Sequence, residues 1–248
     1  PISSLRKITR TLHDSISRVA TGLRVLGGND AASQSLANTL NARAKSFQAA
    51  ERNSNSGIAF LQLAESALTE LNNLATRLKE VGIADTNSNN TASDTAALNS
   101  EAVYVSDTID SIVSSLTYNG INVLGTSSIT KAIGINDAGD TQTIQSTTGI
   151  GATNINDATN ANTSMATSLG EITTSLGAVA GGLTSLQSYR NVASTTAAHL
   201  IAAASNLQDT DFAEETAKIT KQSLIKNYAL AMVATANADE IEKLKLLA

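Results

Sequence analysis

The stretch SISRVATGLRVLGGNDAAS, residues 15–33, holds the sharpest break in a chain that is otherwise rich in helix formers. Before the break, apolar residues recur with a mean spacing of 3.5 residues, the period of a coiled coil rather than of a free helix. These residues are Leu5, Ile8, Leu12, Ile16, Val19, Leu23 and Leu26. Gly27 and Gly28 are expected to end this helix, and Asn29 or Asp30 to cap the next one. The pattern predicts a short amphipathic helix set apart by a break.

A much longer helix is predicted behind the break. Two rows of apolar residues repeat there at multiples of seven. They are Leu40, Phe47, Leu61, Leu68 and Ala75 in one row and Ala50, Ala64, Leu71 and Leu78 in the other. Gly57 interrupts the pattern, but a glycine inside a helix costs only ~1 kcal/mol. We therefore expect one helix over about residues 31–84, roughly 80 Å long at 1.5 Å per residue.

A third helix is predicted after a polar segment at residues 85–95, which has the composition of a turn. Apolar residues return at alternating spacings of four and three from Leu98 to Leu116. Asn119 and Gly120 follow, and this pair predicts a tight turn.

Residues 127–165 break the helical pattern. Apolar residues from Ile129 to Ile135 alternate with a period of two, and the segments NDAGD and TQTIQ follow. This arrangement predicts a β-hairpin. Residues 150–165 are rich in Asn, Thr and Ala and are predicted to form a loop.

The last two helices differ in how their apolar residues are arranged. From Leu169 to Leu207 the seven-residue pattern predicts another long helix. Asp209 or Asp211 is then expected to cap a final helix that runs to the end of the sequence. In that helix the stretch YALAMVATA, residues 228–236, is apolar on all sides and must be buried. Pairing with the first helix would still leave it exposed, so its partners are expected outside the chain.

These patterns predict a mainly α fold: an elongated antiparallel coiled-coil helix bundle with a small β-hairpin insert and paired terminal helices. Three domains are expected. Residues 1–33 and 206–248 form the paired ends, and residues 34–205 form a rod of long helices that contains the β-hairpin region at about 127–165.

Composition excludes several functions. The chain has no cysteine, so thiolate catalysis and disulfides are absent, and its net charge of −5 argues against binding nucleic acid through a broad basic surface. It has no run of 18 or more apolar residues, so membrane insertion is not expected. Pro1 opens directly onto the amphipathic helix, so no cleavable signal peptide is expected. His13 and His199 stand alone, and no catalytic, cofactor or metal motif occurs. The chain is therefore not expected to be an enzyme or to need a cofactor.

Residues 17–73 closely resemble bacterial flagellin, through the segments ATGLRV, NDAAS, RNSNSGIAF and AESAL. The segments TYNGINVLG, SLGAVAGGLTSLQ and NLQDTDFAEETAKITKQSLIKNYALAMVATAN resemble later parts of that family. Gly182 stands where the family usually has Arg, and the first helix is about a dozen residues shorter than is usual. The large outer domains of many flagellins have no counterpart here.

The resemblance implies a structural subunit that polymerises into the bacterial flagellar filament for swimming motility. The terminal helices would form the inner filament core, joined to the rod by a spoke at the break. The alternative is a flagellar hook–filament junction protein, but the compact middle of this chain favours flagellin. A peptidase-bearing flagellin is disfavoured because H-E-x-x-H is absent. A stand-alone secreted coiled-coil effector is a further alternative.

The resemblance further implies partners, location and sites. The partners would be other copies of the chain, an export chaperone, cap and junction proteins, and an innate immune receptor of animals. The protein would be extracellular, exported by the flagellar type III route. The expected filament-core contacts are Leu5, Ile8, Leu12, Ile16, Val19, Leu23, Leu224, Tyr228, Ala231, Met232, Val233, Ile241 and Leu244. The expected inter-subunit or receptor-facing residues are Arg77, Glu80, Val81 and Glu101, with Thr76 and Val81 standing where the receptor-active family has Gln and Leu.

Overall fold

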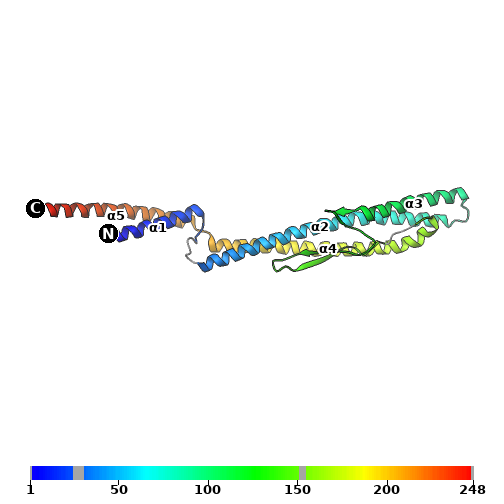
Figure 1. Ribbon diagram of the computed structural model, residues 1–248, viewed down its shortest axis with the longest axis horizontal. Helices are drawn as coiled ribbons and strands as arrows, with labels where there is room; N and C mark the ends of the chain where they lie inside the picture. The colour runs from blue at the N-terminus through cyan, green and yellow to red at the C-terminus, as the bar shows by residue number, and fades with distance from the viewer. Residues whose placement is uncertain (1, 25–30, 151–154, 247–248) are drawn as a thin grey trace. The chain divides into compact units, whose positions relative to one another are not determined.

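The computed structural model describes residues 2–24, 31–150 and 155–246, which form five helices and four short strands (Figure 1). The helices are α1 (Ile2–Thr21), α2 (Ala31–Asp85), α3 (Ala92–Ser115), α4 (Ala158–Gln208) and α5 (Phe212–Leu246). The chain divides into a terminal unit, residues 1–44 and 198–248, and a central unit, residues 45–197. The predicted mainly α fold with paired terminal helices and a β-hairpin insert is confirmed.

The first helix ends earlier than predicted. Helix α1 stops at Thr21, and Gly22 adopts a left-handed conformation with φ of +72° while its N–H donates to the Arg18 carbonyl at 2.8 Å. A glycine in this conformation is the common end of a helix, because other residues are strained there. The predicted end at Gly27 and Gly28, like the predicted caps Asn29 and Asp30 and the apolar residue Leu26, lies outside the described residues.

Helix α2 is unbroken at Gly57, as predicted. A Cβ atom at Gly57 would lie 2.7 Å from a methyl of Leu186 on α4 and 3.1 Å from Ile133. Packing therefore needs a glycine here, and the rest of the helix compensates for its low helix propensity.

Helix α3 begins at Ala92, inside the segment predicted as a turn. Thr91 is its N-cap: the Thr91 hydroxyl accepts from the Asp94 backbone N–H, and the Asp94 carboxylate accepts from the Thr91 backbone N–H at 2.9 Å. This reciprocal capping box starts a helix within a polar stretch. The hydrogen bonds from the Thr91 side chain and backbone also lower the pKa of Asp94.

Two short antiparallel hairpins follow α3. Strands β1 (Thr117–Tyr118) and β2 (Ile121–Asn122) pair around Asn119 and Gly120, whose φ angles are 51° and 74°. Two successive left-handed residues are what a type I′ turn requires, so the predicted turn is confirmed. Strands β3 (Ile129–Gly134) and β4 (Thr141–Thr147) form the predicted hairpin, with Lys131 opposite Ile144.

Helix α4 begins at Ala158, so the loop predicted over residues 150–165 is wrong for its second half. The Asp157 carboxylate accepts from the Asn160 N–H at 3.0 Å, and Ala158, Ala161 and Met165 are fully buried. Small residues at these buried positions give a weak hydrophobic pattern, which is why the sequence did not show this turn of helix as apolar.

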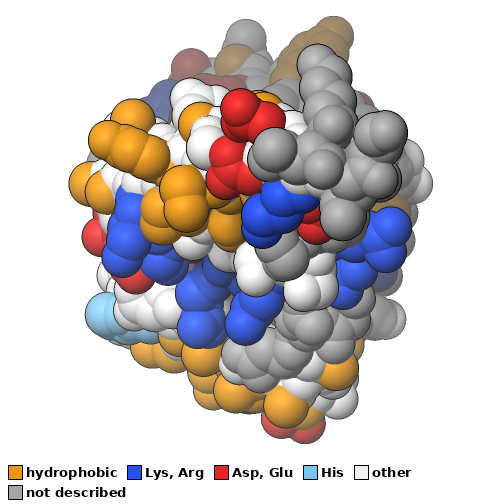
Figure 2. All heavy atoms as spheres, turned by 90° about the vertical axis from the view of Figure 1, so that its left-hand side faces the viewer, with side chains coloured by type: hydrophobic (Ala, Val, Ile, Leu, Met, Phe, Trp, Pro, Cys, Tyr) orange, Lys and Arg blue, Asp and Glu red, His pale blue; other side chains and the backbone are white. Residues whose placement is uncertain are grey.

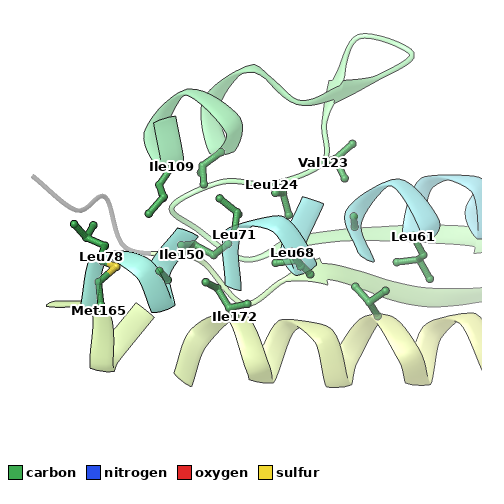
Figure 3. Packing of buried hydrophobic residues seen from close by; sticks show 14 of the residues in the cluster. Leu61, Leu68, Leu71, Leu78, Ile109, Val123, Leu124, Ile150, Met165 and Ile172 are labelled. Atoms are coloured by element: carbon green, nitrogen blue, oxygen red, sulfur yellow. The ribbon is translucent and has the colours of Figure 1, made fainter. Parts of the chain in front are cut away.

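The core of the central unit lies where α2, α3 and α4 meet the segments around the two hairpins (Figure 3). Large side chains from all of these segments point into it. They include Leu61, Leu68, Leu71, Leu78, Ile109, Val123, Leu124, Ile150, Met165 and Ile172. The two seven-residue rows of α2 predicted this core, because Leu61, Leu68, Leu71 and Leu78 are all fully buried.

Candidate functional site

The terminal unit pairs α1 with α5 in antiparallel orientation (Figure 1). On α1, the predicted residues Leu5, Ile8, Leu12 and Val19 are half-buried, and Ser15 is buried between them. Ile16 remains exposed in the single chain, because the buried row passes through Ser15 instead. Four of the seven predicted apolar positions of this helix thus lie in one buried row.

Helix α5 turns an unusually polar side toward α1. Its least exposed positions recur at helical spacing and define a row that we call the inner face of α5. This row consists of Glu215, Lys218, Ile219, Gln222, Lys226, Ala229 and Val233. Only three of these seven side chains are apolar, so burial against α1 stabilises the pair less than a row of leucines would.

The apolar residues of α5 lie instead on the opposite side. Leu224, Tyr228 and Met232 are 57%, 75% and 71% exposed, and they follow one another at spacings of four. A shallow hollow lies on this side, lined by Ala217, Thr220, Lys221, Leu224, Ile225 and Tyr228. We call these residues, with Met232, the outer face of α5. In Figure 2 hydrophobic side chains are exposed beside Lys and Arg side chains on the face toward the viewer.

The stretch at residues 228–236 is therefore not buried within the chain. Only Ala229 and Val233 turn toward α1 and are half-buried, whereas Ala231 is exposed. The expectation that pairing with α1 leaves this stretch exposed is confirmed. Ile241 and Leu23 are also exposed, and the side chain of Leu244 lies outside the described residues.

A buried charge cluster joins α1 to α5. Glu215 is only 3% exposed, and its Oε1 atom accepts from the Arg18 guanidinium at 3.3 Å and from the Lys218 ammonium at 3.1 Å. Burial raises the pKa of Glu215, but hydrogen bonds from Ser15, Lys218 and Arg18 together with the Lys218 charge outweigh it, and the pKa is lowered overall. The other carboxylate oxygen, Oε2, has no hydrogen-bond partner.

Backbone hydrogen bonds join the end of α1 to the start of α5 in the terminal unit, and we call them the backbone clamp. Leu23 and Asp209 form an isolated antiparallel bridge, the Arg24 N–H donates to the Gln208 carbonyl at 2.6 Å, and the Thr210 N–H donates to the Gly22 carbonyl at 3.0 Å. Sequence reasoning missed this clamp, because backbone pairing between distant segments leaves no side-chain pattern.

Of the two caps predicted for α5, Asp211 is the one that caps it. Its carboxylate accepts from the backbone N–H groups of Ala213 and Glu214 at 2.8 and 3.2 Å. Asp209 instead accepts from the Ser205 hydroxyl.

A second cluster lies on the surface of the central unit. The Arg77 guanidinium donates to the carboxylate of Glu101 at 2.7 Å and to that of Glu80 at 3.3 Å, joining α2 to α3. The hydrogen bond to Glu101 is the main cause of a raised pKa at Arg77. Three of the four residues predicted for this surface are thus side by side. Val81 is only 2% exposed and belongs to the core, so its side chain does not face outward.

In the described part of the chain, no group of three or more His, Asp or Glu side chains could hold a metal ion. His13 and His199 are exposed on different helices. None of the helices, over the residues described, has the length and apolar character needed to span a bilayer.

Comparison with known proteins identifies the family of this chain. Residues 2–128 match the family model of the bacterial flagellin N-terminal helical region, which is half of the chain. The chain belongs to the bacterial flagellin family, and the resemblance seen in the sequence is confirmed.

Curated relatives agree with this assignment. A flagellin of Salmonella rubislaw is 34% identical over 137 residues, and a phase 1 flagellin of Salmonella naestved is 35% identical over 144 residues. These matches cover 54% and 57% of this chain but only 28% of each relative, so the chain spans little more than a quarter of their length. A solved Bacillus cereus flagellin is 24% identical, with a TM-score of 0.40 over 63% of this chain and 93% of that chain.

Proposed function

We propose that the chain is a non-enzymatic structural subunit that polymerises with copies of itself into a flagellar filament used for swimming. The observation that carries this proposal is the polarity of α5. Its inner face toward α1 is largely polar, while its outer face exposes Leu224, Tyr228 and Met232 to solvent. A helix that keeps its large apolar residues outward gains stability when other chains cover them.

Self-association through this outer face accounts for a filament rather than a closed oligomer. The outer face of α5 and the α1 side of the pair are different surfaces, so a contact between them in successive copies is head-to-tail. Head-to-tail contacts that do not close into a ring build an open helix. Burying one side chain such as Tyr228 removes on the order of 150–250 Å² of surface from water, and every copy repeats this gain.

The charge cluster of Arg77, Glu80 and Glu101 is a candidate second contact between subunits. It joins two helices of the central unit at an exposed position, and the planar guanidinium can pair with a carboxylate or amide of a neighbouring copy. The same surface is where an innate immune receptor of animals would dock.

The remaining expectations follow from the family. Export would use the flagellar type III route to the cell exterior, with an export chaperone and with cap and junction proteins as further partners. The matched relatives are named as flagellins, and no observation favours the hook–filament junction alternative.

Electron microscopy of the concentrated, purified chain tests the proposal. Leu224→Asp should abolish filaments, because an unpaired carboxylate buried in each contact costs several kcal/mol. Leu36→Asp is the matched control: Leu36 is a similarly exposed leucine on a helix of the same terminal unit, and its substitution should leave filaments intact. Normal filaments from Leu224→Asp, or no assembly of the unaltered chain under any solution condition, would refute the proposal.

A further inference from the structure

The pairing of α1 with α5 lacks the feature that normally fixes how two helices align. In a coiled coil, complementary rows of large apolar side chains set the register. Here the inner face of α5 presents Gln222 and Lys226 at two of its central positions, and Ala229 follows. Small and polar side chains distinguish poorly between one alignment and another that is shifted by a helical turn.

One position on the inner face of α5 carries a buried charge. Glu215 is the buried member of this row, and it is bound from both helices: by Ser15 and Arg18 of α1 and by Lys218 of α5. Lys218 moves with Glu215 because both lie on the same helix. Only the bonds to Ser15 and Arg18 therefore depend on the alignment.

The alignments shifted by four and by seven residues would leave this carboxylate in unfavourable surroundings. A slip of α1 by four residues would replace Ser15 and Arg18 by Thr11 and Asp14, which places a second carboxylate against Glu215. A slip by seven residues would place Ile8 and Thr11 there, and no cation of α1 would face the buried charge. A buried carboxylate that loses its partner is strongly destabilising.

We propose that Glu215 is the positioning residue that selects the register of α1 and α5 along the helix pair, beyond the backbone hydrogen bonds that join the end of α1 to the start of α5. Polar residues in helical interfaces are best attested in this role, in which they select one alignment and contribute little net stability. The consequence for assembly rests on the proposed function: a fixed register holds the outer face of α5 in one orientation, so that every subunit presents the same surface.

Engineered cysteine pairs measure the register directly, because the chain contains no cysteine of its own. The contacts of Glu215 with Ser15 and Arg18, and of Thr210 with Gly22, place Leu12 opposite Ile219. The first pair, Leu12→Cys with Ile219→Cys, reports the observed register. The second pair, Leu5→Cys with Ile219→Cys, reports a slip of seven residues.

Disulfide formation is followed in the full, unpolymerised chain under mild oxidation. Because a disulfide needs closely apposed Cβ atoms, the first pair should form at least about tenfold faster than the second. In a Glu215→Gln background this preference should fall to about twofold or less, with the slipped pair gaining rate. Glu214→Gln is the matched control, since Glu214 is an exposed neighbour that also binds Lys218, and it should leave the preference unchanged.

Two outcomes overturn the proposal. One is a tenfold preference that survives Glu215→Gln, which would assign the register to other residues. The other is an equal loss of rate in both pairs, which would mean that Glu215 stabilises the helix pair without selecting its alignment. Filaments are scored separately by electron microscopy. An unaltered chain that keeps the register preference but forms no filament counts against the proposed function and not against the role of Glu215.

Discussion

The central and terminal units both contain helices with an apolar face, but they bury that face differently. In the central unit, Leu61, Leu68, Leu71 and Leu78 of α2 are fully buried within one chain. In the terminal unit, Leu224, Tyr228 and Met232 of α5 are mostly exposed, and polar side chains occupy the inner face. Periodicity therefore predicts that a helix has an apolar face, but not whether the partner of that face belongs to the same molecule.

The largest expected effect is on the stability of the central unit. Leu71→Ala should lower the free energy of unfolding by about 3 kcal/mol, because it leaves a cavity in a closely packed core. Tyr228→Ala removes more atoms but should change that free energy by less than about 0.5 kcal/mol, since its side chain is 75% exposed. Chemical denaturation of the soluble chain measures both. A large effect of Tyr228→Ala would show that the outer face is already partnered within the chain.

The second effect concerns how closely two helices of the central unit approach. A Cβ atom at Gly82 of α2 would lie 2.5 Å from the Asn162 backbone nitrogen and 3.0 Å from the Ala158 carbonyl oxygen of α4. Gly82→Ala should therefore destabilise the chain by about 2 kcal/mol despite the better helix propensity of alanine.

Gly177 of α4 is the matched control for Gly82, since no atom lies within 4 Å of a Cβ built there. Gly177→Ala should raise the free energy of unfolding by about 0.5–1 kcal/mol. Thermal melting of the two variants compares them, and equal effects of the same sign would contradict the close approach of α2 and α4.

The sequence predicted the parts of the fold that depend on large apolar side chains and missed those that do not. Leu61 and Leu68 predicted α2, and the pair Asn119–Gly120 predicted the turn between β1 and β2. The start of α4 was missed because Ala158 and Ala161 are small, and the start of α3 was missed because Thr91 and its partner look like turn residues. A capping box acts through hydrogen bonds at two positions and adds nothing to the apolar period that predicts a helix.

The candidate site was predicted to a similar extent. The outer face of α5 was expected from its apolar composition, and Arg77 with its two carboxylates from the family resemblance. Glu215 was not singled out as a partner of Arg18, because an acidic residue in the first turn of a helix is usually explained by the helix dipole. Two residues almost 200 positions apart in the sequence can be recognised as an ion pair only when the fold is known.

The third prediction, smaller in size, is that acid loosens the terminal helix pair and leaves the central core intact. Because hydrogen bonds lower the pKa of Glu215, its contribution to folding is complete above the ordinary carboxyl pKa of about 4.3 and is lost as the pH falls through the lowered value. The groups facing it are Ser15 and Arg18 of α1 and Lys218 of α5, and the two cations stay charged throughout.

Spin labels on the exposed positions Thr11 and Thr220, introduced as cysteines, would follow this change. The distance distribution between them should broaden below about pH 4. Glu215→Gln should show a broad distribution at every pH, and Glu214→Gln should behave as the unaltered chain. A distribution that stays narrow at pH 2 in the unaltered chain would contradict the prediction.

The smallest effect on the single chain is expected at Arg77. Its ion pairs with Glu80 and Glu101 are solvent-exposed, and such pairs contribute little to folding because water and salt screen them. Arg77→Ala should therefore leave the melting temperature of the soluble chain unchanged.

If this surface contacts a neighbouring subunit, the same variant should reduce filament yield or alter filament shape, because the guanidinium fork is then desolvated between two chains. Arg52→Ala, which removes an exposed arginine elsewhere on α2, is the matched control and should change neither. Melting curves and electron micrographs of both variants test this prediction. Unchanged filaments from Arg77→Ala would make Arg77 an ordinary surface residue, and a lowered melting temperature would make it part of the fold of the central unit.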